Sequence, residues 1–84
     1  MLLSQLFEYV LYPPPRWAQR ELTTRGWMPT TTAGEYEHPD APGFYVEVDD
    51  VGGKTSFVVF QGSKKIGRLS RPPYASHLNL RMRA

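Results

Sequence analysis

Hydrophobic positions follow a helical period in the first residues of the chain. Leu3, Leu6, Phe7 and Val10 recur at three- and four-residue spacing, with polar side chains between them. This spacing places the apolar side chains on one side of a helix. The pattern predicts an amphipathic helix within residues 1–12, whose apolar face needs a covering surface.

A proline run separates this segment from a second helical pattern. The three prolines at 13–15 lack backbone donors and disfavour the α conformation of the residues before them, which predicts a stiff extended connector. A second helix is expected over residues 16–25, with Gly26 as its left-handed stop. We expect Trp27 to pack back on Leu22, a contact that commonly accompanies this kind of helix ending.

Beyond the second helix, hydrophobic and polar residues alternate with a period of two, which is typical of strands. Gly-Gly at 52–53 and Gly-Ser at 62–63 are turn sequences between alternating segments. The segment SFVVFQ is apolar on both sides, as expected for a central strand, and its two phenylalanines fall on opposite faces. The predicted strands cover residues 28–32, 34–38, 44–49, 56–61 and 64–69.

The end of the chain alternates again. One side carries Leu78, Leu80 and Met82, and the residues between them are polar or basic. This alternation predicts an extended arm over residues 72–84 that either closes the chain's own sheet or adds to the sheet of a partner.

Together these elements predict an α+β protein. One or two N-terminal helices pack on an antiparallel four- to five-stranded β-meander, followed by the C-terminal extended arm. The 84 residues are expected to form a single small domain, 1–84, in which 16–71 hold the second helix and the meander. Because so small a chain buries only about two-thirds of its unfolded surface, a partner subunit would add stability, and a homodimer is one possibility.

Composition narrows the classes of protein. Cys is absent, which excludes disulfides, thiolate metal ligands and cysteine nucleophiles. No apolar run reaches the length of about 18 residues that a membrane span needs. The N-terminus lacks the basic region and the cleavage site of a signal peptide, so we expect a cytoplasmic protein without membrane association.

Charge is divided along the chain although the net charge is only +2. Residues 1–34 carry +1, residues 35–50 carry −6 and residues 51–84 carry +7. One interpretation is that lysines and arginines of the last strand pair with acids on a neighbouring strand. The other is that the basic third binds phosphates or an acidic protein surface.

Catalytic chemistry has little support in the sequence. His38 and His77 lie in no nucleophile or metal-binding spacing, and Gly52-Gly53 lacks the context of a phosphate-binding loop. The acidic segment 35–50 does not have the spacing of an EF-hand, and whether it binds a cation stays open. We therefore expect no enzyme activity, no cofactor and no dedicated metal site.

These observations favour a small non-catalytic binding protein that occupies a surface on a macromolecular partner, as a regulator, inhibitor or assembly factor does. A protein partner is favoured, and the expected steering toward an acidic surface rests on the arginines near the C-terminus. The alternative is a nucleic-acid-binding module that uses the basic C-terminal third. The predicted partner-binding residues are Leu3, Phe7, Val10, Tyr45, Lys64, Lys65, Arg68, Arg71, Arg81 and Arg83.

Overall fold

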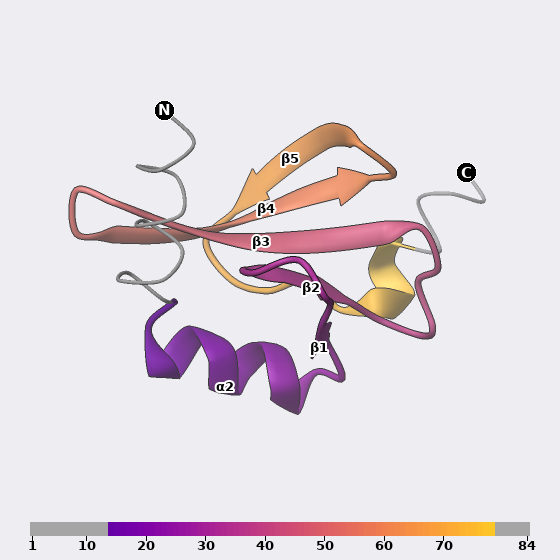
Figure 1. The fold of residues 1–84 in the computed structure, drawn as a ribbon, viewed down its shortest axis with the longest axis horizontal. Coiled ribbons are helices and arrows are strands. Elements are labelled where there is room, and N and C mark those ends of the chain that lie inside the picture. The colour runs from indigo at the N-terminus through magenta and orange to yellow at the C-terminus, as the bar shows by residue number, and fades with distance from the viewer. Residues whose placement is uncertain (1–13, 79–84) are drawn as a thin grey trace.

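The computed structural model describes residues 14–78 and shows one helix followed by a five-stranded antiparallel sheet (Figure 1). The strands are neighbours in chain order, so the sheet is a meander and the predicted α+β class is confirmed. A further helical segment begins at Ala75 and is described as far as Leu78. The elements are α2 (Arg16–Thr24), β1 (Met28–Pro29), β2 (Glu35–Glu37), β3 (Phe44–Val51), β4 (Lys54–Gln61) and β5 (Lys64–Leu69).

The end of α2 has the geometry that its sequence predicts. Gly26 has φ +88°, and its N–H donates to the carbonyl of Thr23 at 3.0 Å. The N–H of Trp27 donates to the carbonyl of Leu22 at 2.9 Å. These two hydrogen bonds form a Schellman motif, which turns the chain from the helix directly into the sheet.

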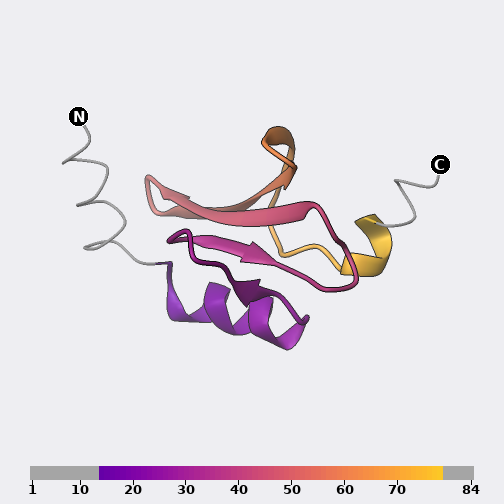
Figure 2. The same ribbon diagram turned by 45° about the vertical axis from the view of Figure 1, so that its right-hand side comes forward.

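The core lies between α2 and one face of the sheet. Leu22 and Ala18 of the helix are fully buried, and Trp27 is 1% exposed. Figure 2 shows α2 lying along β1 and β2, while the β4–β5 hairpin rises away from the helix. The sheet contributes alternate side chains to this core, as a period of two requires; they are Tyr36, Phe44, Val46, Phe57 and Val59.

The segment after β5 returns to the α2 side and completes the core. The indole Nε1–H of Trp27 donates to the carbonyl of Pro73 at 2.9 Å, and Arg25 donates to the carbonyl of Pro72. Ala75 and Leu78 are 5% and 4% exposed and belong to the same cluster.

The structure corrects the predicted arm at its start. His77 and Leu78 are helical rather than extended. The physical reason is that Ala75 and Leu78 are three residues apart, a spacing that brings both side chains onto the core only in a helix. Residues 79–84 of the predicted arm lie outside the described part, as do 1–13 with the predicted N-terminal helix.

The first strand is also shorter than predicted. β1 ends at Pro29, and the chain then turns around the side chain of Thr30. Its hydroxyl accepts the N–H of Thr32 at 3.0 Å and donates to the carboxylate of Glu35 at 2.7 Å. Such local side-chain bonds compete with strand pairing, so a threonine run with high β propensity becomes a turn here.

Candidate functional site

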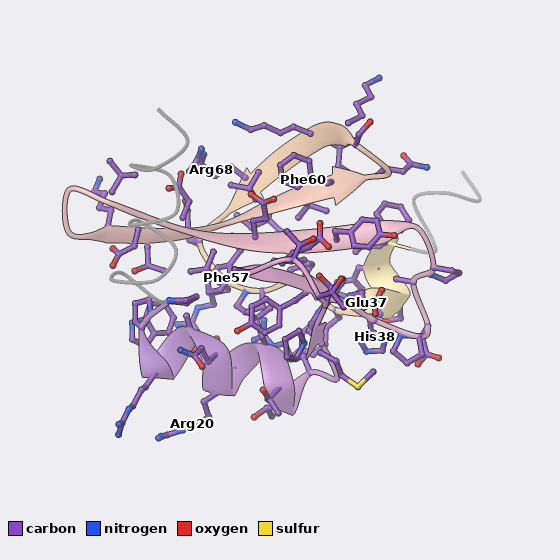
Figure 3. The ribbon with its side chains drawn as sticks, in the orientation of Figure 1. Arg20, Glu37, His38, Phe57, Phe60 and Arg68 are labelled. Carbon is purple, nitrogen blue, oxygen red and sulfur yellow. The ribbon has the colours of Figure 1, made fainter. Side chains whose placement is uncertain are left out.

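The face of the sheet that points away from α2 is the main candidate surface, and it is called the open face below. None of the helices or strands within residues 14–78 covers it (Figures 1 and 2). Figure 3 shows Phe57 on the α2 side of β4 and Phe60 on the opposite side, which confirms their predicted separation. The open face comprises Glu35, Glu37, Tyr45, Glu47, Asp49, Ser56, Val58, Phe60, Lys65 and Arg68.

Strand register arranges these side chains in rows that cross the sheet. In one row Glu37 pairs with Tyr45, Tyr45 with Phe60 and Phe60 with Lys65. This row therefore runs from a carboxylate through two half-buried aromatic rings to an ammonium group. Directly opposed aromatic residues on antiparallel strands stabilise each other, so the row is a fixed structural unit.

The neighbouring row repeats the order of charges. Glu35 pairs with Glu47, Glu47 with Val58, and Val58 with Arg68. Val58 is only 5% exposed. Acids thus lie on the β2–β3 side of the open face, an apolar strip lies in its middle, and cations lie on β5.

A hollow of about 600 Å³ lies on this surface. Val58 and Phe60 contribute apolar lining, and Glu47, Lys65 and Arg68 contribute charge. The mixture of an apolar lining with opposed charges fits recognition of another molecule better than a uniformly solvated strand face.

The cations of β5 take part unequally in ion pairs. The Nη1 of Arg68 lies 2.6 Å from Oδ2 of Asp49 and also donates to the hydroxyl of Ser56 at 2.6 Å. The arginine reaches Asp49 across β4, because β3 and β5 are not adjacent. Lys64 and Lys65 form no salt bridge with any acid among residues 14–78, so the expected pairing of acids with cations holds for one residue of the three.

The acids repel one another on the open face. Burial raises the pKa of Glu47, and the nearby carboxylates of Glu35 and Asp49 raise that pKa further. Within residues 14–78, no group of three or more acidic or histidine side chains has the placement to hold a metal ion. Arg68 pairs with Asp49, so it offsets part of this repulsion, and an additional cation near Glu47 would be a favourable neighbour.

The imidazole ring of His38 forms hydrogen bonds within the fold. Its Nε2 lies 2.9 Å from the carbonyl of Arg25, and its Nδ1 accepts the N–H of Asp40 at 3.0 Å. This pair of bonds requires the neutral tautomer with the proton on Nε2. The ring therefore links the end of α2 to the loop before β3, which is a structural role.

A second surface lies at the C-terminal end of α2. It is called the basic corner below and comprises Arg25, Arg71, Tyr74 and His77. The guanidinium carbon of Arg25 lies 4.5 Å from the centre of the Tyr74 ring. The Tyr74 and His77 rings meet nearly perpendicularly, with their centres 5.5 Å apart. These four residues help to line a hollow of about 360 Å³.

The predicted site residues divide between these surfaces. Tyr45, Lys65 and Arg68 come together on the open face, whereas Arg71 belongs to the basic corner. Lys64 is exposed at the start of β5. The other predicted residues, Leu3, Phe7, Val10, Arg81 and Arg83, lie outside the described residues.

Sequence analysis missed the aromatic partner of Tyr45 and the corner's other members. The Gly-Ser turn at 62–63 would have placed Phe60 near Lys65, and an estimate of the β3–β4 register would have added Tyr45. No comparable signal exists for Arg25 and Tyr74, which are 49 positions apart in the chain.

Comparison with known proteins gives no relative: the chain matches no protein-family model, no curated protein and no solved structure at a significant level. Among residues 14–78, no helix has the length and apolar character needed to cross a membrane.

Proposed function

We propose that this chain is a small non-catalytic binding protein that occupies a surface on a protein partner through its open face. The observation that carries the proposal is the row Glu37, Tyr45, Phe60 and Lys65, in which two aromatic rings lie between opposite charges. Tyrosine and other aromatic residues are enriched at protein interfaces, and flanking charges fix the orientation of the partner.

The layout of the open face defines the chemistry of this partner. A convex apolar element, such as an amphipathic helix, fits the hollow beside Val58 and Phe60. Its cationic side would face Glu35 and Glu47, and its acidic side would face Lys65. Burial is the main cause of the raised pKa of Glu47, and the carboxylates of Glu35 and Asp49 raise it further; docking in this orientation would place a cation against these carboxylates.

The edges of the sheet favour binding by the face rather than by strand addition. β1 has only two residues, one of them Pro29, which has no N–H to donate. The other edge, β5, carries Lys64 and Lys65, and its pairing with β4 is interrupted by a bulge between Val59 and Phe60. Lysines and bulges on an edge strand oppose pairing with another chain.

Nucleic acid is a poor occupant of the open face. Four carboxylates share this surface with two cations, and one of those cations, Arg68, is already paired with Asp49. Phosphates would meet net repulsion there, so the nucleic-acid alternative has no support from this surface.

A homodimer through Leu3, Phe7 and Val10 stays a separate hypothesis, based on the amphipathic sequence pattern alone. Its test is the mass of the free protein by light scattering, with Phe7→Asp as the variant. We expect dissociation to the monomer if these residues form the contact, and an unchanged mass contradicts it. A cytoplasmic location and a role as regulator, inhibitor or assembly factor also belong to the proposal.

The test of the open face is a capture experiment from cytoplasmic extract with nuclease present. Phe60→Ser and Tyr45→Ser remove the aromatic row, and Arg20→Gln is the control, because Arg20 is exposed on α2 and points away from the sheet (Figure 3). We expect one stoichiometric protein to bind the wild type and the control and to be lost with both serine variants. Equal capture by all four proteins would show that the open face is not the contact surface.

A further inference from the structure

The basic corner is built by two parts of the chain that are distant in sequence. Arg25 follows α2, whereas Arg71, Tyr74 and His77 all belong to the segment that follows β5. Hydrogen bonds from Trp27 to Pro73 and from Arg25 to Pro72 hold the segment in place. The corner shares no lining residue with the hollow of the open face, so it is a separate surface.

The charge of the corner is of one sign. The polar residues that line its hollow are Arg25, Ser70, Arg71, Tyr74 and His77, and no described lining residue carries a carboxylate. Glu21 approaches Arg25 at 4.0 Å but is not part of the lining. Arg71 is exposed and forms no salt bridge within residues 14–78, so its guanidinium is available to an anion.

An aromatic ring is presented beside these cations. Tyr74 is 51% exposed, although the two residues before it, Pro72 and Pro73, are buried. Arg25, whose side chain is only 17% exposed, lies over the Tyr74 ring and is held by the carbonyl of Pro72. Tyr74 is thus fixed in orientation by Arg25, while about half of the surface of the whole residue stays exposed.

From this arrangement we propose that the basic corner binds a nucleotide, with its phosphate on Arg71 and its base stacked on Tyr74. Arginine recognises phosphate through paired hydrogen bonds, and bases stack on exposed aromatic rings without requiring a particular sequence. The volume of about 360 Å³ lies within the usual range for small-ligand sites. The nucleotide is either a free mononucleotide or one unit of a single-stranded nucleic acid.

The two sources are separated by two probes. Adenosine monophosphate is titrated by isothermal calorimetry, with adenosine and inorganic phosphate as comparisons. A fluorescently labelled single-stranded RNA of about ten nucleotides is titrated by anisotropy at several salt concentrations. If the RNA binds more tightly than adenosine monophosphate, the ligand is one unit of a single-stranded nucleic acid. If the two probes bind with equal affinity per site, the ligand is a free mononucleotide.

Variants assign the roles of the two residues. Tyr74→Ala is expected to weaken binding about tenfold, whereas Tyr74→Phe keeps the ring and stays within about twofold of the wild type. Arg71→Gln should lower the slope of log affinity against log salt for the RNA by about 0.7, the value for one phosphate contact on a single strand. Arg20→Gln makes the same charge change elsewhere and is expected to leave this slope near that of the wild type.

Several results would overturn the proposal. They are the absence of saturable binding of either probe, equal affinity for inorganic phosphate and adenosine monophosphate, or equal effects of Arg71→Gln and Arg20→Gln. Because Tyr74 and Arg71 are exposed, we expect their substitutions to leave the fold intact. Circular dichroism is used to check that each variant is folded before it is titrated. The open-face capture experiment uses different residues, so the two proposals succeed or fail separately.

Discussion

The open face and the basic corner both combine aromatic rings with arginine, but they are made in different ways. On the open face, strand register alone sets the order of Glu37, Tyr45, Phe60 and Lys65. In the basic corner, no regular pairing exists, and two long-range hydrogen bonds set the positions. A regular sheet thus mixes acids with cations, whereas the irregular segment after β5 carries Arg71 away from the acids.

The largest change in the free energy of unfolding should come from substitution of Gly26, the glycine between α2 and the sheet. Gly26 has φ +88°, and a Cβ there would lie 2.5 Å from Nε2 of His38. We expect Gly26→Ala to lower the free energy of unfolding by about 3 kcal/mol, since left-handed strain and a steric clash add together. Urea denaturation measures the change.

The matched control for this prediction is Gly67→Ala on β5, where a Cβ meets no atom within 4 Å and the backbone is not left-handed. We expect this variant to stay within about 0.5 kcal/mol of the wild type. A similar loss in both variants would mean that the crowding at His38 is unimportant. Because His38 contacts the carbonyl of Arg25, Gly26→Ala should also disturb the basic corner more than the open face.

An intermediate effect is expected from Trp27→Phe. The substitution removes the indole N–H that donates to Pro73 and leaves a buried carbonyl without its partner. The expected loss of stability is about 2 kcal/mol. Hydrogen exchange should show faster exchange within residues 74–78, with β3 and β4 changed only by the global loss. Uniform acceleration across both regions would contradict a local role for this bond.

The smallest expected change in stability concerns Glu47 on the open face, whose contribution to the free energy of unfolding depends on pH. Since the native pKa of Glu47 is raised by burial and by Glu35 and Asp49, the folded protein holds this proton more tightly than the unfolded chain does. Its contribution to stability therefore falls as pH rises from the ordinary glutamate value through the raised native value, and is constant above it. The cations Lys65 and Arg68 on β5 limit the size of this effect.

Glu47→Gln removes this ionisation. We expect it to raise the free energy of unfolding at neutral pH by about 0.5 kcal/mol and to flatten the decline between acidic and neutral pH. Denaturant unfolding at several pH values measures both. Glu37→Gln is the control, because its register partner is Tyr45 rather than another acid. A loss of stability in Glu47→Gln would show that the carboxylate has a favourable partner.

Sequence patterns predicted the elements whose signals are local. The Gly26 stop and the meander follow from residues close together in the chain, as does the separation of Phe57 from Phe60. The alternation near the C-terminus gave a wrong prediction for His77 and Leu78. Ala75 and Leu78 pack in the core against residues distant in the chain, and no local sequence pattern indicates that packing. For the same reason, Tyr45, Lys65 and Arg68 could be grouped from the sequence, whereas the pairing of Arg25 with Tyr74 could not.

The meander has a consequence for the order of folding. Each strand pairs with the one next to it in the chain, so the sheet forms through short loops that close quickly. The bonds from Trp27 to Pro73 and from Arg25 to Pro72 join residues 46 and 47 positions apart and therefore close much longer loops. We therefore expect the sheet to be assembled before the corner closes, so that the corner is complete only in the last step of folding.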